Sequence, residues 1–391
     1  MTSQFEYQPL NDSGEAQKLG ELLTQCFISP PGVESRYIDR IGMQNFRAIY
    51  RARELLGGLS MIPMGQWYGG QRVPMVGIAS VGIAPEYRSS GAAIALMQQM
   101  IKELYQQGMA LSALYPAAQR LYRKAGYEQG GTYCGWKIIP DHIQLRDIVL
   151  PVQAISPSLD WVQPIYQRQA HHHNGNLDRH PCLWQELLQV EEQQPLYVYR
   201  LGSPSDPEGY LIFDQKRTSE GTTLNIRDWA TLTNAAGRSI WAFLASHRSQ
   251  IDTIYWKGGS TDFLTLMLPE QRWESRFNER WMLRIIDIAS ALESRGYPSY
   301  LEVELHLNVH DDLIPENNGP LTLSVADGKG SVMPGGKAEL AIDIRGLASL
   351  YSGLFSPHQL QLAGYLTGTD TSMAIATQLF SSTEPWMPDF F

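Results

Sequence analysis

The spacing of apolar positions over residues 1–140 alternates between the helical period and the strand period. Apolar residues three or four apart predict amphipathic helices, whereas alternating or short continuous apolar runs predict strands. In chain order, the predicted elements are helices over 15–27 and 34–48, strands over 52–62 and 73–83, a helix over 91–108, a strand over 109–115, a helix over 117–125 and a strand over 132–139. Gly57-Gly58 and Gly69-Gly70 are predicted to be hairpin turns. This order is that of a mixed α/β domain.

The rest of the chain divides into two further parts by the same criterion. Pro151 and Pro157 lie in a polar connection of the kind found between domains. The predicted elements of the second part are a helix over 182–191, strands over 196–201, 209–213 and 222–229, a helix beginning near 235 and a strand over 253–257. Those of the third part are a helix over 288–293, strands over 299–309, 321–326 and 337–343, and a helix over 344–352. We therefore predict three domains, over 1–148, 149–284 and 285–391.

Composition places the chain among folded proteins without a membrane span. Of its 391 residues, 43% are hydrophobic and 18% charged, which suffices for several buried cores. No apolar run approaches the roughly 20 residues of a spanning helix, and the first residues show no secretory leader, so we expect a cytoplasmic protein. Cys26, Cys134 and Cys182 lie far apart, which favours buried free thiols over disulfides or a zinc site. The aromatic C-terminus is expected to be docked, because free Trp and Phe side chains gain nothing from exposure to water.

The charge of the chain bears on its partners. Lys and Arg total 31 against 40 Asp and Glu, a formal net charge of −9, which repels the phosphate backbone of nucleic acids. The same charge attracts cationic small molecules such as polyamines and amino-sugars. The run His171-His172-His173 is the one segment that invites a metal, but consecutive side chains do not converge on one ion. We therefore expect no nucleic acid partner and no metal.

A strand, a turn and a helix over residues 76–97 carry the clearest chemical signal. The helix opens near Gly91, and a helix N-terminus offers unpaired backbone N–H groups and the positive end of a dipole to an anion. Gly91 and Ala93 leave the backbone accessible, and Arg88 adds a charge-assisted donor. The segment has neither the spacing of a dinucleotide-binding loop nor that of a P-loop. A pyrophosphate cradle and an ordinary helix cap both fit this segment.

Two motifs resemble those of the GNAT superfamily of acetyltransferases. The segment from Val81 to Ala93 is similar to the acetyl-CoA motif Arg/Gln-x-x-Gly-x-Gly/Ala, and the segment from Leu121 to Tyr127 resembles the Leu-Tyr-x-x-x-Gly-Phe/Tyr element. The three-part layout, the stretch RIIDIASALESRGYP and the aromatic C-terminus resemble the enhanced intracellular survival (Eis) type. The resemblance implies tandem GNAT domains, the second degenerate, followed by a domain like a sterol carrier protein. It also implies an N-acetyltransferase that uses acetyl-CoA and assembles as a hexamer.

The resemblance assigns roles to particular residues. The backbone at Val81 and Ile83 would pair with the pantetheine arm, and Tyr122 would be the general acid that protonates the departing thiolate. The pyrophosphate loop would be formed by Arg88, Ser89, Ser90, Gly91, Ala92 and Ala93. Because serines stand at positions 89 and 90, where basic side chains are common, phosphate binding would depend on Arg88 and backbone donors. A core tyrosine is the alternative for Tyr122.

The resemblance also implies a role for the chain terminus and for the acceptor pocket. The α-carboxylate of Phe391 would be the general base, which requires a dry site or a relaying water because a carboxylate is a weak base for an ammonium group. A docked structural tail is the alternative. Phe27, Tyr37 and Phe46 would wall the acceptor pocket or belong to the core, and Asp389 would receive a cationic substrate. The acceptor would be an aminoglycoside, a polyamine or a lysine-type amine, and a non-catalytic CoA- or lipid-binding protein is the rival function.

Overall fold

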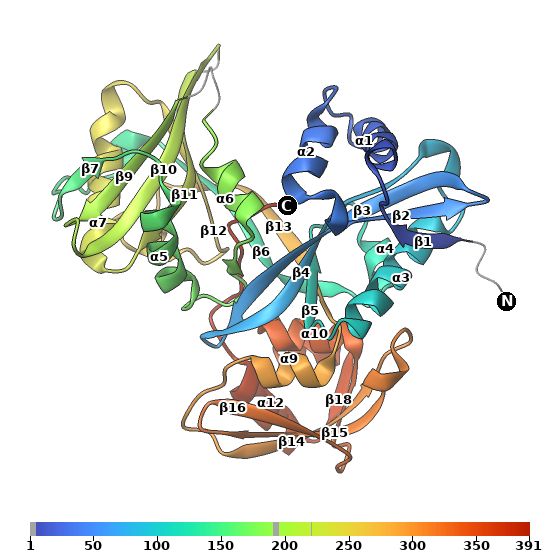
Figure 1. Ribbon diagram of the computed structural model, residues 1–391. Helices are drawn as coiled ribbons and strands as arrows, with labels where there is room; N and C mark the ends of the chain where they lie inside the picture. The colour runs from blue at the N-terminus through green and yellow to red at the C-terminus, as the bar shows by residue number, and fades with distance from the viewer. Residues whose placement is uncertain (1–4, 191–194, 220) are drawn as a thin grey trace. The chain divides into compact units, whose positions relative to one another are not determined.

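A computed structural model describes residues 5–190, 195–219 and 221–391. Contacts between residues divide the chain into two compact units. The first holds the chain up to Gly130, together with Trp281–Ser382 and Phe391, and the second holds Gly131–Arg280 and Thr383–Phe390. Each unit is described by itself below, with the labels of Figure 1.

The first unit begins with a mixed sheet flanked by helices. Its strands follow one another in space as β1 (Glu6–Pro9), β2 (Phe46–Arg51), β3 (Glu54–Tyr68), β4 (Gln71–Ile83), β5 (Leu111–Leu114) and the end of β13 (Glu274–Ile285). Among these neighbouring pairs, β4–β5 is parallel and the others are antiparallel. The helices are α1 (Ser13–Phe27), α2 (Val33–Ile41), α3 (Ala92–Gln106) and α4 (Gln119–Arg123), with the short 3₁₀ turns η1 (Met43–Asn45) and η2 (Pro85–Tyr87).

Alternation along β3 determines which helix covers which face of this sheet. Leu59 and Met61 belong to the same buried cluster as Leu96 and Met97 of α3. Gly58 faces the other way, where a Cβ atom would lie 2.9 Å from Leu19 of α1. The strand period of two therefore places α3 and α1 on opposite faces.

The first unit also contains a second sheet, of five strands. Their order is β16 (Lys329–Pro334), β15 (Gly319–Ala326), β14 (Val303–His310), β17 (Leu340–Asp343) and β18 (Leu366–Gly368), with only β14–β17 parallel. Leu305, Leu307 and Val309 of β14 are buried, whereas the residues between them are more exposed, so one face is covered. Figure 1 shows helices α9, α10 and α12 gathered beside this sheet. The helices are α9 (Ile288–Ser294), α10 (Ile344–Ser352), α11 (Pro357–Leu362) and α12 (Asp370–Phe380), with η5 (Pro315–Asn317) before β15.

The second unit repeats the pattern of the first sheet. Its strands lie in the order β7 (Val152–Ala154), β9 (Leu196–Gly202), β10 (Pro207–Thr218), β11 (Gly221–Thr231), β12 (Thr253–Gly258) and β6 (Glu128–Ile138). The parallel pair is β11–β12, and α7 (Asn234–Ala245) connects it as α3 connects β4 to β5. The remaining elements are α5 (Leu159–Ala170), β8 (Leu177–Asp178), α6 (Pro181–Leu187), α8 (Phe263–Leu266), η3 (Pro140–His142) and η4 (Ser246–Ser249). Tryptophans dominate its core, among them Trp229, Trp241 and Trp256.

The predicted mixed α/β class and most predicted elements are confirmed, and two local predictions are wrong. Gly57-Gly58 is not a turn but lies inside β3, where glycine is required at position 57 because a Cβ there would collide with the backbone of the neighbouring strand at Gly82. The turn before β3 is formed by Ala52 and Arg53, which have positive φ angles of 51° and 68°. The turn at Gly69-Gly70 is confirmed.

The predicted helix over 34–48 is too long. Helix α2 ends at Ile41, and Gly42 follows with a φ of 90°, a conformation that ends a helix. Phe46 consequently begins strand β2 and is not helical. In the third part, residues 329–334 form strand β16 within a glycine-containing tract for which no strand was predicted.

No helix within the described ranges has the length and apolar character that a membrane span requires.

Candidate active site

Strands β4 and β5 pair over only part of their length. The pairing runs from Met75 opposite Leu111 to Ile78 opposite Leu114, and β4 then continues to Ile83 while β5 ends. A bulge interrupts the β3–β4 register between Ala79 and Gly82, and Ser80 within it has a φ of 50°. The backbone that follows the paired part of β4, including the predicted pantetheine positions Val81 and Ile83, therefore has an edge that β5 does not cover. A ligand can add hydrogen bonds along such an edge.

The loop after β4 leads into an open helix N-terminus. Ser89 and Gly91 have positive φ angles of 65° and 89°, and α3 begins at Ala92. A Cβ on Gly91 would meet nothing within 4 Å, so the glycine is needed for its left-handed conformation and not for space. Ser90 Oγ accepts a hydrogen bond from the Ala92 N–H at 3.3 Å. Since the first N–H groups of a helix lack partners within it, and Arg88, Ser89 and Gly91 are exposed, an anion can reach this loop.

The C-terminal end of α1 lies against the same stretch of β4. The Cys26 thiol donates to the carbonyl oxygen of Ile83 at 3.3 Å, and its burial raises its pKa. A Cβ on Gly82 would lie 2.6 Å from Leu23. This glycine lies within the Val81–Ala93 motif, although it was not among the predicted site residues. Its lack of a side chain lets α1 approach β4 closely.

Tyr122 is buried on the short helix that follows β5. Its side chain is 5% exposed, and its ring lies edge-on to that of Tyr127 at 6.2 Å. Burial raises the pKa of Tyr122 to about 12, so its phenol is protonated at neutral pH. Tyr127 OH has a partner in Ser112 Oγ at 2.7 Å, whereas none of the described residues forms a hydrogen bond with the Tyr122 hydroxyl. Of the two phenols, Tyr122 is the one available to a ligand.

The terminal residue Phe391 lies at the β4–β5 pair. A Cβ on Gly77 of β4 would be 2.6 Å from the Phe391 ring, and the ring is edge-on to Tyr115 at 5.8 Å. Gly77 precedes the last paired residue of β4, and Tyr115 directly follows β5. Neither contact has a local signal in the sequence, because each joins residues that are far apart in the chain.

The three aromatic residues predicted to wall the acceptor pocket differ in exposure. Phe46 is fully buried, and its ring lies edge-on to Tyr37 at 6.0 Å. Tyr37 OH is 3.2 Å from Ser60 Oγ of β3. Phe27, at the end of α1, is 46% exposed, and Ile28 after it is 92% exposed. Phe27 is therefore the one of the three that reaches solvent most freely.

Asp389, the fourth predicted acceptor residue, belongs to the second unit and is part of a buried ionic network. Its Oδ1 lies 2.8 Å from Arg179 Nε, and Arg179 also binds Asp228 through two bonds of 2.7 and 3.0 Å. The Arg179 guanidinium lies over the rings of Tyr166 at 3.7 Å and Trp184 at 4.5 Å. Burial raises the pKa of Asp389, against the lowering effect of Arg179. We call Arg179, Asp228 and Asp389 the tail clamp.

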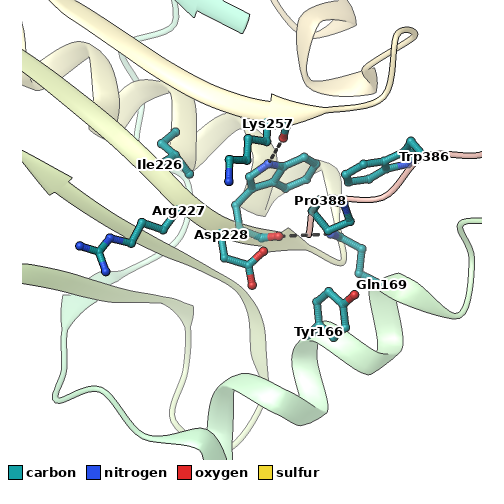
Figure 2. Close-up of a pocket in the computed structure, with 9 residues that line it drawn as sticks. Tyr166, Gln169, Ile226, Arg227, Asp228, Lys257, Trp386 and Pro388 are labelled. Carbon is teal, nitrogen blue, oxygen red and sulfur yellow. Dashed lines mark hydrogen bonds between the residues drawn. The ribbon is translucent and has the colours of Figure 1, made fainter. Parts of the chain in front are cut away.

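Residues before Asp389 are held to the second unit by backbone hydrogen bonds. Thr132 donates its N–H to the Pro385 carbonyl at 2.9 Å and accepts from the Met387 N–H at 3.1 Å. Trp386 stacks on Trp229 at 6.1 Å. Figure 2 shows Trp386 and Pro388 among the residues that line one pocket together with Asp228 and Tyr166. The tail therefore fills the end of the β11–β12 pair, the position in the second unit that corresponds to the open edge of β4.

The N-terminus of α7 is closed, in contrast to that of α3. Thr233 Oγ1 accepts from the Ala236 N–H at 3.1 Å and donates to the Glu208 carboxylate at 2.6 Å. A side-chain cap and a neighbouring carboxylate both oppose an anion there. Of these two helices, α3 is the one suited to a pyrophosphate. Among the described residues, no group of three or more His, Cys, Asp or Glu side chains could hold a metal ion.

A strand that separates from its parallel neighbour, an open helix N-terminus directly after it and a protonated phenol on the next helix are compatible with an acetyltransferase of the CoA-dependent class. Residues 6–130 and 175–285 each match a family model described as an acetyltransferase (GNAT) domain, and residues 288–388 match a sterol carrier protein domain. A crystal structure of a GCN5-related N-acetyltransferase from Anabaena variabilis is 52% identical, with a TM-score of 0.97, over 99% of this chain and 100% of that one. The chain belongs to the GCN5-related N-acetyltransferase family.

Curated relatives support the same conclusion. An uncharacterised N-acetyltransferase from Streptomyces avermitilis is 26% identical over 83% of this chain and 83% of its own length. The N-acetyltransferase Eis from Mycobacterium tuberculosis is 25% identical over 77% of this chain and 76% of its own length. The predicted resemblance to the Eis type, with two GNAT domains before a sterol-carrier-like domain, is confirmed. The protein is an N-acetyltransferase, and enzymes of this class use acetyl-CoA.

Proposed function

We propose that the protein transfers the acetyl group of acetyl-CoA directly to a primary amine, with Tyr122 as general acid and the α-carboxylate of Phe391 as general base. The observation that carries this proposal is the position of Phe391 at the β4–β5 pair, against Gly77 and Tyr115. The open edge of β4 continues from this pair, and the helix that bears Tyr122 is the element that follows β5 in the chain.

The cosubstrate would bind along the open edge of β4. The segment from Arg88 to Ala93, in which Arg88, Ser89 and Gly91 are exposed, would hold the pyrophosphate, with the dipole and N–H groups of α3 and the Arg88 guanidinium as donors. Backbone groups at Val81 and Ile83 would pair with the pantetheine arm, which would direct the thioester toward the end of β5. An N–H group there would also stabilise the oxyanion that forms on attack.

The chemistry requires a neutral amine and a proton for the leaving thiolate. The terminal carboxylate would take the amine proton, directly or through one water, beside the Phe391 ring and Tyr115. Tyr122, protonated at neutral pH, would donate its proton to the sulfur as the carbon–sulfur bond breaks. The products are an N-acetylated amine and free CoA.

The acceptor would be a cationic amine of the aminoglycoside, polyamine or lysine type. The net charge of −9 favours such molecules on encounter. Phe27 and Tyr37 would form part of the pocket wall, with Phe46 supporting Tyr37 from the core. By its resemblance to the Eis type, the enzyme would be a cytoplasmic homo-oligomer, and we propose a hexamer.

The test is release of free CoA thiol from acetyl-CoA by the full chain with an untagged C-terminus, in the presence of an aminoglycoside, spermidine or a lysine peptide. We expect amine-dependent release with at least one acceptor. A matched protein with one glycine added after Phe391 should bind acetyl-CoA with unchanged affinity in calorimetry but turn over at least tenfold more slowly. Full activity of this extended protein would refute the role of the carboxylate. Cofactor binding without release for any amine would favour the non-catalytic alternative.

A further inference from the structure

A pocket of about 580 Å³ opens in the second unit, and the residues that line it all belong to that unit. It is formed by the loop after α5, the segment from Gly259 to Trp273 and the tail at Thr383–Trp386. The volume lies within the range of small-molecule sites. None of the residues that line it takes part in the proposed reaction.

Aromatic rings form much of its wall. Phe263 and Trp273 are half-buried, and Trp386 packs against His173 at 5.7 Å on another side. Trp273 is held edge-on to Trp136 at 5.1 Å, and Phe263 stacks on His173 at 6.2 Å. The rings are thus fixed by neighbours and leave part of their surface to the pocket. Faces of Trp and Phe attract cations through the ring quadrupole.

The charge of the pocket is negative. Glu384 lines it, with Oε2 accepting from the Ser260 and Thr261 hydroxyls, so the carboxylate is held in place. Asp262 also lines it, fixed by Trp256 Nε1 at 2.8 Å and the Leu264 N–H at 2.9 Å. No Lys or Arg occurs among the described residues that line the pocket.

The ionisation of two lining groups at mildly alkaline pH supports this charge. Burial raises the pKa of Asp262 to about 6, so its carboxylate is charged at pH 8. Burial, with the nearby His172, lowers the pKa of His173 to about 4, so its imidazole is neutral at the same pH.

We propose that this pocket is a second binding site, specific for a small organic cation with an alkylated ammonium head. Such a head fits between aromatic rings, where ring faces and carboxylates stabilise its charge while its methyl groups bury apolar surface. An inorganic cation would bury no apolar surface against the rings, and a neutral ligand would leave the carboxylates without a charged partner. The site is independent of the proposed acetyl transfer, because a quaternary ammonium has no N–H to acetylate.

Choline and its uncharged carbon analogue 3,3-dimethylbutan-1-ol provide a matched pair of probes. We expect the full chain, at pH 8 and without acetyl-CoA, to bind choline at least tenfold more tightly than the analogue in calorimetry. Glu384→Gln keeps an oxygen that accepts a hydrogen bond from Ser260 but loses the negative charge, and it should weaken choline binding at least fivefold. Trp273→Leu should weaken choline binding by a similar factor. Glu274→Gln, a carboxylate beside Trp273 that is paired with Lys137 instead, should leave binding unchanged.

Fluorine NMR of protein labelled with 5-fluorotryptophan locates the bound probe. Choline should shift the resonance that disappears in Trp273→Leu, and should not shift that of Trp161, which does not line the pocket. Equal affinity for the neutral analogue, unchanged binding in Glu384→Gln, or no binding of choline would overturn the proposal. The proposal would also be overturned if the Trp273 resonance shifted with protein concentration and not with choline, because a second molecule of the protein would then cover the pocket.

Discussion

Two neighbouring tyrosines of the first unit have opposite surroundings. Tyr127 is fully buried and its hydroxyl is paired with Ser112, whereas the Tyr122 hydroxyl has no partner among the described residues. The motif contains both residues, and the sequence assigned Tyr122 to chemistry by resemblance alone. The structure adds a physical reason for this choice, because a buried phenol without a partner is ready to donate to a ligand.

Replacing these tyrosines in turn tests the assignment. We expect Tyr122→Phe to lower kcat by about 10²–10⁴-fold, the usual contribution of a general acid, with acetyl-CoA affinity unchanged in calorimetry. The matched control Tyr127→Phe loses a buried hydrogen bond and should cost about 1 kcal/mol of stability with kcat near that of the wild type. Wild-type turnover by Tyr122→Phe would rule out its role as the acid.

The raised pKa of Tyr122 also predicts the shape of the pH–rate profile. With a pKa of about 12, the phenol keeps its proton through pH 10, while the acceptor amine becomes neutral. The rate should therefore rise from pH 7 to pH 10 without an alkaline fall, when it is measured as CoA release at saturating acetyl-CoA. In unfolding experiments, the contribution of this group to stability is fully present below the unfolded pKa of about 10. It is lost as the pH rises through about 12. A rate that falls between pH 8 and pH 10 in the wild type, but not in a Tyr122→Phe variant with residual activity, would contradict this assignment.

At the scale of elements, the loop between β4 and α3 combines an exposed charge with an open helix end. Arg88→Ala removes one charge-assisted hydrogen bond, worth about 1.5–3 kcal/mol. We expect the Kd for acetyl-CoA to rise roughly tenfold or more, with kcat little changed. Arg248→Ala, which removes an exposed arginine of η4, is the control for loss of positive charge. An unchanged Kd in Arg88→Ala would place the pyrophosphate elsewhere.

The elements show which features local sequence can predict. Helix α3 and its N-terminal loop were predicted because their signals, the helical period and a glycine at the helix start, lie within a few neighbouring residues. The turn predicted at Gly57-Gly58 is wrong because these glycines allow two strands to approach each other closely. A pair of glycines is also common in turns, so local sequence does not distinguish the two cases. The tail clamp had no signal, since Arg179 and Asp389 meet only in the folded second unit.

At the scale of the whole molecule, one pattern of strands and a crossover helix occurs twice with different outcomes. In the first unit, the edge of β4 and the end of α3 stay open. In the second unit, Thr233 and Glu208 close the helix end, and Trp386 fills the place beside Trp229. Where the first unit has the proposed cofactor site, the second unit thus binds the last residues of the chain. If Phe391 supplies the base, this binding has a role in catalysis.

The tail clamp permits a test of this role. Asp389→Asn removes one charge from the clamp and leaves Arg179 paired with Asp228, so the fold should persist, whereas removing Arg179 would strand two buried aspartates at a cost of about 3–5 kcal/mol. We expect Asp389→Asn to lower kcat about tenfold with acetyl-CoA affinity unchanged, because the tail that carries Phe391 is less firmly positioned. Asp206→Asn, at an exposed aspartate of the same unit, should have no effect.

Structural damage and mispositioning of the terminus are separated by combining Asp389→Asn with the protein extended by one glycine. The extension already displaces the terminal carboxylate. If Asp389 acts only by positioning that carboxylate, replacing Asp389 in the extended protein should not lower kcat further. The double variant should therefore turn over at the rate of the extended protein, a non-additivity that defines coupling between the two changes. If the two losses multiply instead, Asp389 contributes to activity by another route, such as the stability of the second unit, and the clamp does not position the base.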